Sequence, residues 1–480
     1  MPEKSKSFIW QKFWPAVAKG YSGVSLPFPT LAKVALEDTQ LRANLARATN
    51  TIRNKRAKVV AEVADWEALR QAGHDIKMDA LANLSSHLQD FEAEFTKAGG
   101  VVHWARNSQE ACEIVAAIAI ANQITQVVKV KSLTTDEINL NEYLEARGIE
   151  AKETDLAELI VQLADEHPSH ILVPAIHKNR DQIRELFLEK ISEAPADLSN
   201  SPRELAMTAR AHLRNRFLSA RMAVSGANFA IAESGTLCVV ESEGNGRMCL
   251  TLPEILVTVV GIEKILPKWR DLEVFLQLLP RSSTGERMNP YTSFWTGAGD
   301  GPTKRHVILL DNGRIQTLAD ENGREALACI RCSACMNVCP VYERTGGHSY
   351  NSVYPGPIGA IITPQLLGPG QAKTLPFAST LCGACYDVCP VKINIPKILL
   401  HLRAKENDAN APLTEKLSMR AAAFALGPKG LKILAKIVRT ISPILNSRIF
   451  GQITKHLPVA KKWSAFREIP APRLNKDGTP

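Results

Sequence analysis

Seven of the ten cysteines fall into two short runs, and their spacing restricts what this part of the chain can fold around. The first run is Cys329-x2-Cys332-x2-Cys335-x3-Cys339-Pro340, and the second is Cys382-x2-Cys385-x3-Cys389-Pro390. A thiolate at every third residue of a tight loop can hold three corners of a cubane iron-sulfur cluster, and a fourth Cys followed by Pro ligates the other cluster. The runs therefore predict one crossed module that holds two clusters and carries electrons.

Crossed ligation gives four thiolates to one cluster and three to the other. We assign Cys329, Cys332, Cys335 and Cys389 to the first cluster, and Cys339, Cys382 and Cys385 to the second. The position three residues before Cys382 is Ser379. The second cluster is then either a 3Fe-4S centre or a 4Fe-4S centre whose odd iron is held by Ser379, by water, or by a thiol from elsewhere or from a partner. Because ligands and hydrogen bonds set the potential, we expect the two clusters to differ in potential.

Zinc binding and disulfide formation are the two other uses of such cysteines, and both are disfavoured. Zinc sites usually show two Cys-x2-Cys pairs or mixtures of Cys and His. Disulfides belong to oxidising compartments, whereas lysines and a proline interrupt residues 1–22 before any signal-peptide hydrophobic region forms. No run approaches the ~20 apolar residues that span a bilayer. The sequence therefore predicts a cytoplasmic protein, where thiols stay reduced.

Positive charge is concentrated near the C-terminus. Residues 416–467 contain eleven Lys and Arg and no Asp or Glu, and the whole chain has a net charge of +9, so the rest of it carries −2. A basic amphipathic helix is predicted from apolar residues at helical spacing, Leu431, Leu434, Ile437, Val438 and Ile441, interleaved with Lys429, Lys432, Lys436 and Arg439. Such a helix can dock on an acidic partner or on the anionic inner face of a membrane. The alternative is a solvated face of a packed helix.

The rest of the chain shows an α/β pattern between helical ends. Residues 20–120 have helical periodicity. Strands are predicted at Gln126–Val130, Ile171–Ala175, Phe229–Ile231, Thr236–Val240, Ile255–Val260 and His306–Leu310, with helices at Asn179–Glu189 and Leu205–Val224. We divide the chain into an N-terminal helical region (1–65), an α/β domain (66–311), a ferredoxin-type two-cluster module (312–395) and a basic helical C-terminal domain (396–480).

Two segments of the α/β domain are candidates for a shared ligand crevice. Residues 226–237 read Gly-Ala-Asn-Phe-Ala-Ile-Ala-Glu-Ser-Gly-Thr-Leu, with Glu233 as a candidate catalytic carboxylate and backbone amides that can bind an anion. Residues 131–135, Lys-Ser-Leu-Thr-Thr, follow another strand and can supply a cation and hydroxyls. The simpler interpretations are a hairpin with a Gly turn for the first segment and a helix N-cap at Thr134 or Thr135 for the second.

Other polar residues carry weaker signals. His167, His170 and His177 invite a metal interpretation, but the last two flank a predicted strand, so structural or capping histidines are favoured. Cys112, Cys238 and Cys249 lie in apolar surroundings and are interpreted as small buried hydrophobes. No dinucleotide-binding or Walker sequence is present, so nothing supports nicotinamide or ATP binding.

Several of these segments together resemble the lactate utilization protein B family, the iron-sulfur subunits of bacterial L-lactate oxidation systems. They are residues 228–236, Lys131-Ser132-Leu133, Pro168–Lys178, Gly261-Ile262-Glu263-Lys264, and the two cysteine runs with Ser379. The resemblance covers residues 20–465. It implies a lactate-utilization domain similar to the sugar isomerase and CoA transferase group, a ferredoxin-like module with two 4Fe-4S clusters, and a helical tail. It also implies that the absence of Cys at 379 belongs to the family pattern, and that lactate becomes pyruvate in a complex with two other subunits.

The function predicted from the sequence is therefore electron transfer in L-lactate oxidation that allows growth on lactate, as a carrier rather than the sole catalyst. One alternative keeps the clusters but changes the donor to glycolate, glycerol phosphate or another 2-hydroxy acid. Another makes the α/β domain a CoA transferase-like enzyme with Glu233 near the reacting carbonyl, although a fold does not determine a function. Nucleic-acid binding rests only on residues 416–467 and is not expected. The sequence leaves open where lactate binds, whether a partner holds a flavin, and what finally accepts the electrons.

Overall fold

The computed structural model describes residues 26–299, 301–368, 370–410, 413–433 and 436. The described residues up to Lys405 form one compact unit, and those from Glu406 onward belong to a second. The first unit contains the N-terminal helices, the α/β domain and both cysteine runs.

A six-stranded parallel sheet forms the centre of the α/β domain, in the order β1-β10-β7-β4-β2-β3. Its strands are β1 (Val101–Ala105), β2 (Gln126–Lys129), β3 (Glu150–Glu153), β4 (Met222–Ser225), β7 (Ile255–Gly261) and β10 (Lys304–Leu310). The central strands β4 and β7 are buried along their whole length. Their side chains alternate between two apolar clusters, so that Val257 packs on one face of the sheet and Leu256 on the other. This two-sided burial explains the continuous apolar runs in the sequence.

A smaller four-stranded sheet has the order β8-β5-β6-β9. It consists of β5 (Phe229–Ile231), β6 (Thr236–Glu241), β8 (Ile265–Leu266) and β9 (Tyr291–Trp295). β5 and β6 form an antiparallel hairpin joined by the short turn η2 (Ala232–Ser234). Gly235 ends this turn with φ +61°, and a Cβ there would lie 2.4 Å from the Phe95 backbone nitrogen. The hairpin interpretation of residues 226–237 is therefore confirmed.

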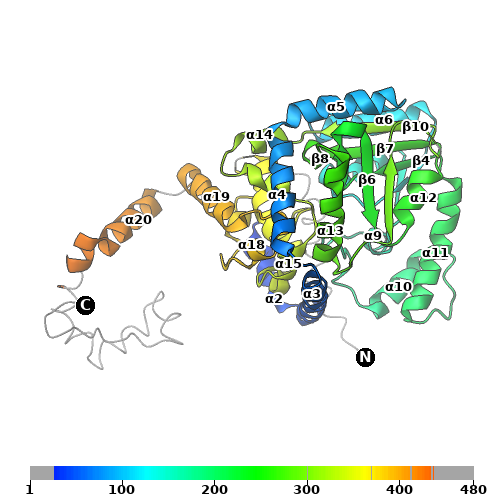
Figure 1. Cartoon of the computed structure of the whole chain (residues 1–480). Helices are drawn as coiled ribbons and strands as arrows, with labels where there is room; N and C mark the ends of the chain where they lie inside the picture. The colour runs from blue at the N-terminus through cyan, green and yellow to red at the C-terminus, as the bar shows by residue number, and fades with distance from the viewer. Residues whose placement is uncertain (1–25, 300, 369, 411–412, 434–435, 437–480) are drawn as a thin grey trace. The chain divides into compact units, whose positions relative to one another are not determined.

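Helices cover both faces of the large sheet. Residues of α6 and α8 pack with one apolar cluster, and α5 packs with the small sheet in the other (Figure 1). The helices of the domain are α5 (Leu84–Lys97), α6 (Ser108–Ala121), α7 (Leu133–Glu137), α8 (Leu140–Glu145), α9 (Leu156–Leu163), α10 (Arg180–Lys190), α11 (Pro202–Ser219), α12 (Asn245–Thr251) and α13 (Leu272–Ser283), with the short turns η3 (Ile262–Lys264) and η4 (Trp269–Asp271).

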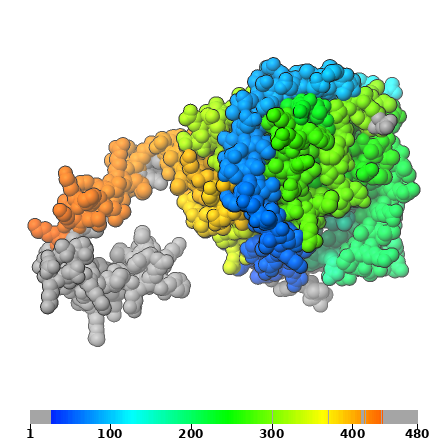
Figure 2. All heavy atoms as spheres, viewed as in Figure 1, coloured from blue at the N-terminus to red at the C-terminus, as the bar shows by residue number. Residues whose placement is uncertain are grey.

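The N-terminal helices pack along the boundary between the α/β domain and the cysteine module. Figure 2 shows them as a blue band between the green domain and the yellow and orange module. α3 contacts α13 on one side and α15 and α16 on the other, and Asp38 caps α3 by accepting from Leu41 N at 2.8 Å. The helices here are α2 (Phe28–Glu37), α3 (Thr39–Val60), α4 (Trp66–Ala82), α14 (Arg314–Ala319), α15 (Ala334–Asn337), α16 (Tyr342–Thr345), α17 (Gly356–Leu367), α18 (Ala384–Asp387) and α19 (Ile395–Asn410), with η5 (Arg324–Ala328), η6 (His348–Tyr350) and η7 (Leu375–Phe377).

One apolar core joins the domain to the module. Phe275 and Leu278 of α13 belong to the same buried cluster as Ile358 and Ile361 of α17. The module therefore shares its core with the α/β domain. It does not form a separate hydrophobic cluster.

The predicted α/β organisation is confirmed, but some elements were wrong. Residues 171–175 form turns instead of a strand, because His170 Nδ1 accepts from the Leu172 and Val173 amides and Pro174 has no amide hydrogen. The helix predicted at Leu205–Val224 ends at Ser219, and its last residues form β4 in the buried centre of the sheet. Residues 20–120 were predicted as helical throughout, which missed the edge strand β1.

The second unit contains α20 (Leu413–Leu426) and helical residues at 428–433. Of the predicted basic amphipathic helix, Leu434, Ile437, Val438, Arg439 and Ile441 lie outside the described residues, as does the rest of the basic segment to Arg467. Among the helices that the structure describes, none is long and apolar enough to cross a membrane.

Candidate iron-sulfur centre

The two cysteine runs fold into loops of the same backbone shape. In the first loop Arg331 (φ 60°) and Ser333 (φ 59°) flank Cys332 in the left-handed conformation, and α15 follows. In the second loop Leu381 (φ 55°) and Gly383 (φ 87°) flank Cys382 in the same way, and α18 follows. Left-handed residues are uncommon outside glycine, so their repetition around the cysteines marks an internal structural repeat.

Ser379 takes the place in the second loop that Cys329 takes in the first. The Arg331 backbone N–H donates to Cys329 Sγ at 3.3 Å, and the Leu381 backbone N–H donates to Ser379 Oγ at 3.1 Å. The second loop therefore presents a hydroxyl oxygen at the position where the first presents a thiol.

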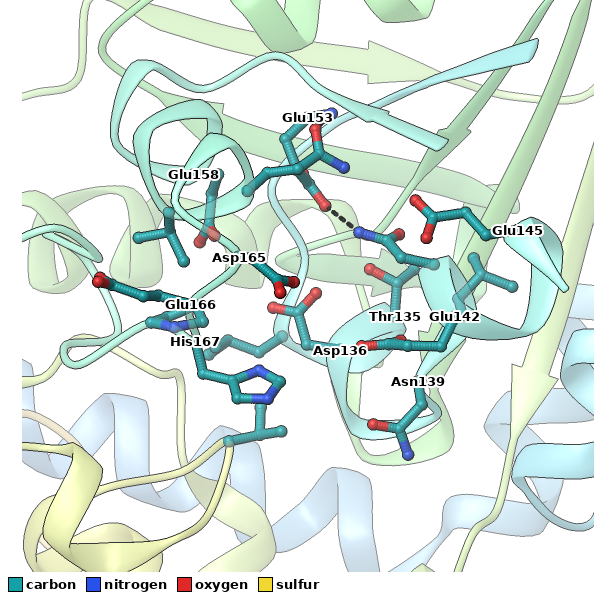
Figure 3. A pocket seen from close by; sticks show the side chains of 17 residues that line it. Thr135, Asp136, Asn139, Glu142, Glu145, Glu153, Glu158, Asp165, Glu166 and His167 are labelled. Atoms are coloured by element: carbon teal, nitrogen blue, oxygen red, sulfur yellow. Dashed lines mark hydrogen bonds between the residues drawn. The ribbon is translucent and has the colours of Figure 1, made fainter. Parts of the chain in front are cut away.

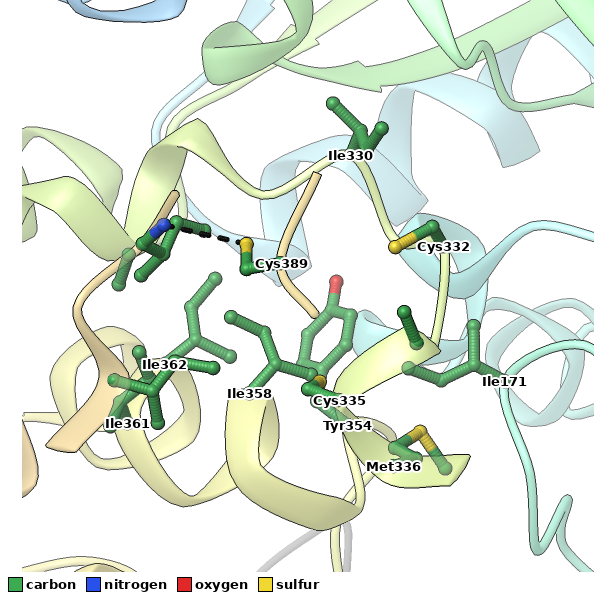
Figure 4. Packing of buried hydrophobic residues seen from close by; sticks show 14 of the residues in the cluster. Ile171, Ile330, Cys332, Cys335, Met336, Tyr354, Ile358, Ile361, Ile362 and Cys389 are labelled. Atoms are coloured by element: carbon green, nitrogen blue, oxygen red, sulfur yellow. Dashed lines mark hydrogen bonds between the residues drawn. The ribbon is translucent and has the colours of Figure 1, made fainter. Parts of the chain in front are cut away.

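Four thiols from both runs line one cavity. They belong to Cys329, Cys332, Cys335 and Cys389, and apart from Ser333 the other side chains around the cavity are apolar. Figure 4 shows Cys332, Cys335 and Cys389 around Ile358 in this part of the core. The Ile393 backbone N–H donates to Cys389 Sγ at 3.4 Å. An apolar cavity lined by four thiols fits a cubane cluster, whose ligands are thiolates.

The other three cysteines of the runs lie near one another at a more open position. Burial, followed by the negative charges of Cys339 and Cys382, raises the pKa of the Cys385 thiol to about 12. Cys339 and Cys385 are buried, but Cys382 is exposed. All ten cysteines are free thiols, so neither run is crosslinked by a disulfide.

Arginines of the N-terminal helices hold the end of the second run. Arg70 Nε donates to the Cys389 carbonyl at 2.9 Å, and Arg70 Nη2 donates to the Tyr386 carbonyl at 3.1 Å. Arg56 Nη2 donates to the Val388 carbonyl at 3.0 Å. These bonds position the loop that delivers Cys389 to the four-thiol cavity, which gives α3 and α4 a role in the site that the sequence did not reveal.

A buried charge network joins the cysteine module to the α/β domain. Arg314 of α14 bonds to both oxygens of Glu137 at 2.8 and 2.9 Å and to Glu263 Oε2 at 2.5 Å. Glu263 Oε1 also lies 3.4 Å from Arg331 Nη2. Burial alone would raise the pKa of Glu263, but Arg314, with Lys264 and Arg331, lowers it to about 2. These carboxylates are therefore ionised, and each is neutralised by arginine.

The predicted crevice exists as a cavity of about 260 Å³ at the carboxyl ends of β2, β4 and β6. Lys131 and Ser132 line it together with residues 226–228, as expected from the sequence. Lys264 and Arg331 also line it, and sequence reasoning did not single out either as a site residue. The visible signal was the pair Glu263-Lys264, two charged residues directly after the apolar strand β7. The observed N-cap of α7 is Ser132, which lies two or three residues before the predicted caps Thr134 and Thr135.

Glu233 does not line this cavity. It is exposed at the turn of the β5–β6 hairpin, where its carboxylate accepts from the Trp269 backbone N–H at 2.8 Å. Ser132 also packs closely against Gly226, because a Cβ at residue 226 would lie 2.4 Å from Ser132 Oγ. The strand motif therefore shapes one wall of the crevice, while its carboxylate points elsewhere.

A second cavity, of about 300 Å³, lies on the other side of α7 and is acidic (Figure 3). Asp136, Glu153 and Glu158 are among its lining side chains. Lys129, the cation beside them, is buried and bonds Glu153 at 2.6 Å and Asp136 at 3.4 Å. Burial raises the pKa of Asp136 to about 6. Leu133 lines both cavities, so one short helix separates an acidic cavity from the basic side chains of the crevice.

His170 and His177 have hydrogen-bond partners in the structure, and the three remaining cysteines are buried. In the described part of the chain, no three His, Cys, Asp or Glu side chains converge on a single metal ion. His170 Nε2 pairs with Asn337 Oδ1 at 3.2 Å, and His177 pairs with Ser169 and Glu166 at 2.9 and 2.7 Å. Cys112, Cys238 and Cys249 are buried at 0–1% exposure.

Two family models match two different parts of the chain. The LUD domain family model matches residues 88–310, and the 4Fe-4S dicluster domain model matches residues 325–393. The second match assigns two 4Fe-4S clusters to the segment that contains both cysteine runs. A solved structure of a DUF162 family protein from Deinococcus radiodurans is 15% identical, covers 47% of this chain and 98% of its own, and gives a TM-score of 0.27, which is too low to support an argument.

Curated relatives match almost the whole chain. "Lactate utilization protein B" of Oceanobacillus iheyensis is 41% identical over 91% of this chain and 92% of its own length. The proteins of the same name from Bacillus cytotoxicus and Anoxybacillus flavithermus are each 40% identical, over 91% and 92% of this chain and 93% and 94% of their own lengths. With this identity over nearly the full length, and with both domain models in the expected order, the chain belongs to the lactate utilization protein B family.

Proposed function

We propose that this chain is the iron-sulfur electron-transfer subunit of a system that oxidises L-lactate to pyruvate and so allows growth on lactate. The observation that carries the proposal is the four-thiol cavity built from both cysteine runs and attached to the α/β domain through a shared core. The printed names of the curated relatives support lactate as the donor.

Two 4Fe-4S clusters, when bound, supply one-electron carriers that suit the stepwise removal of two electrons from a 2-hydroxy acid. Cys329, Cys332, Cys335 and Cys389 would hold the first cluster in the four-thiol cavity. Cys339, Cys382 and Cys385 would hold the second. Backbone N–H groups of Arg331, Tyr342 and Ile393 donate to sulfurs of the two sets, and such hydrogen bonds favour the electron-rich form of a thiolate.

Ser379 is the proposed fourth ligand of the second cluster. Its hydroxyl occupies the loop position of Cys329 and accepts the equivalent backbone hydrogen bond. Arg403 holds the same residue from the other side by donating to the Ser379 carbonyl at 3.1 Å. An oxygen ligand in place of sulfur changes the potential of the second cluster.

Two further subunits complete the proposed system. This chain then acts as a carrier within an oxidoreductase complex, located in the cytoplasm. Its basic residues 416–467 would contact an acidic partner or the inner face of the membrane. Glycolate or another 2-hydroxy acid is the alternative donor. Nothing in the geometry favours a transferase, because Glu233 is exposed and lies outside the crevice.

Spectroscopy on anaerobically purified protein tests the cluster assignment. Wild type should contain about eight irons and show EPR signals only after reduction. A Ser379→Ala variant should keep about seven irons and gain a signal in the oxidised state, whereas Ser379→Cys should keep about eight. Zinc in place of iron would refute the electron-transfer function. An unchanged Ser379→Ala variant would leave that function standing and remove Ser379 as a ligand.

Growth assays test which acid is the electron donor. Deletion of the gene should abolish growth on L-lactate and leave growth on glycolate unchanged. The reverse result would replace lactate by the alternative donor.

A further inference from the structure

The crevice beside the cysteine module is lined by basic side chains that keep unused hydrogen-bond donors. The Lys264 side chain is 7% exposed and forms no hydrogen bond or ion pair with any described residue. Arg331 is 8% exposed, and its Nη1 has no hydrogen-bond partner in the described part of the chain. Lys131, the third cation, donates to the Leu172 carbonyl at 2.8 Å. Burial lowers the pKa of Lys264 to about 7, and an anion bound beside it would stabilise its charged form.

Among the residues that the structure describes, the acidic side chains of the crevice form no ion pair with these cations, and they accept hydrogen bonds from backbone amides. Glu241 accepts from the Gly246 and Arg247 amides at 2.8 and 2.6 Å. Asp155 caps α9 by accepting from Ala157 and Glu158. Glu243 accepts from the Leu156 amide at 3.3 Å. The carboxylates are therefore held at helix starts, and the cations remain available to a ligand.

The neighbouring network supplies no further negative charge. Glu263 is the one carboxylate that bonds Arg331, and it is shared with Arg314 at 2.5 Å. Arg331 also stacks on Tyr354, with its guanidinium carbon 4.6 Å from the ring centroid, which fixes the plane of the guanidinium group. Arg331 is thus pre-oriented, with Nη1 still free to donate.

Size and chemistry define the ligand class. The cavity volume of about 260 Å³ lies below the ~300–1,000 Å³ typical of sites for drug-sized ligands, which favours a small ligand. A planar guanidinium beside an ammonium matches a carboxylate. Ser132 offers a hydroxyl, and Asn228 uses its carbonyl oxygen to accept from Val240, which leaves its amide N–H groups as donors. Such groups suit a hydroxyl or keto oxygen next to a carboxylate.

We propose that this crevice binds a small 2-hydroxy or 2-oxo monocarboxylate, with Lys264 and Arg331 holding the carboxylate and Lys131 at the side of the site. The anion site follows from these side chains alone, and the choice of a 2-hydroxy or 2-oxo acid rests on the proposed function. The site adjoins the first cluster position, because the Arg331 backbone N–H donates to Cys329 Sγ while its side chain lines the crevice.

Titration calorimetry on the full-length protein with its iron content verified tests the proposal, with L-lactate, pyruvate and inorganic phosphate as probes. Wild type should bind L-lactate or pyruvate saturably, with one site per chain, and phosphate should not displace them. Lys264→Met should weaken binding about tenfold or more, because a charged hydrogen bond is lost. Lys131→Met should weaken it less. Lys190→Met serves as the matched control, because Lys190 is exposed and pairs with Glu189 at 3.0 Å.

Three results would overturn the site. The first is that wild type with both clusters binds neither acid, and the second is that the Lys264 and Lys131 variants both bind as wild type does. The third is that phosphate binds as tightly as the acids, which would indicate recognition of charge alone. If Lys264→Met does not fold, Lys131→Met decides. If protein with eight irons does not bind the acids, the site is refuted and the electron relay stands. If protein that contains zinc in place of iron binds them, the site stands and the relay is refuted.

Discussion

The two cluster positions share one loop shape but differ in their surroundings. The first has four thiols in an apolar cavity, and Arg56, Arg70 and Arg331 lie around its loops. The second has three thiols and a serine hydroxyl, and Cys382 is exposed. Repetition of the backbone therefore places the ligands, while the neighbouring side chains make the two positions chemically different. We expect the first cluster to be protected and tuned by charge, and the second to be more accessible.

Removing one thiol from each position gives the largest expected effect. Cys389→Ala should lose about four irons, because this residue belongs to the first site, and the remaining EPR signal should be that of the second cluster. Cys382→Ala should remove the other signal and keep the first. Iron analysis and EPR of both variants check the assignment. If either variant lost the signal expected to survive, the crossed ligand sets would be wrong.

Stability should depend on the buried network beside the first position more than on the equivalent contacts beside the second. Arg314→Met leaves Glu137 and Glu263 buried without their main counter-ion and should cost about 3–5 kcal/mol. Arg403, the matched residue near Ser379, donates to two carbonyls at a partly exposed position, and Arg403→Met should cost about 1–2 kcal/mol. Urea unfolding measures both. Equal losses would show that the two positions are anchored alike.

A smaller and pH-dependent effect is expected from His170, whose Nε2 pairs with Asn337 of α15 at 3.2 Å. Burial lowers the pKa of His170 to about 4, and its Nδ1 accepts from two backbone amides. The unfolded side chain titrates near 6.5, so the unfolded state binds more protons than the folded state between pH 6.5 and 4. The free energy of unfolding therefore decreases as the pH decreases through that window. From pH 7 to pH 5 the loss should be about 2 kcal/mol.

His170→Gln should remove this part of the pH dependence. His348 is also buried, and burial lowers its pKa to about 3. The variant should therefore keep the part of the pH dependence that comes from His348. Urea midpoints at pH 7 and pH 5 for both proteins give the comparison. If the variant has the same pH slope as wild type, His170 does not contribute to the pH dependence of folding stability.

Much of the fold was predictable because its signals are local. The apolar runs of β7 and β10 and the hairpin of residues 226–237 identify strands without any tertiary information. The errors came where tertiary contacts decided the structure. Residues 171–175 have strand composition, but His170 takes two of their amide hydrogens. Met222–Ser225 continue a helical pattern, yet they lie in the buried centre of the sheet.

The cluster ligands were equally local, since their spacing is itself the signal. The sequence predicted only some of the residues that line the crevice. Lys131 and residues 226–228 follow strands, and parallel strands bring their carboxyl ends together. Lys264 and Arg331 are contributed by segments on either side of the domain boundary, and no pattern in the chain pairs them. Glu233 was chosen because it lies in a conspicuous motif, and the turn of the hairpin directs it away from the crevice.

The finest difference between the two positions concerns the charge of Arg331. Its backbone contacts Cys329 Sγ, and its buried guanidinium lies beside the first position only. A nearby cation favours the reduced and more negative form of a cluster, so Arg331→Met should lower the potential of the first cluster. A loss of about tenfold in the reduction equilibrium corresponds to about 60 mV for one electron. EPR-monitored redox titration should show this shift with the second potential unchanged. Arg403→Met provides the matched control and should leave the first potential where it is. The contrary result is that Arg331→Met moves both potentials together, or the second alone. In that case the charge of Arg331 does not distinguish the two clusters, and the serine ligand accounts for the whole difference between their potentials.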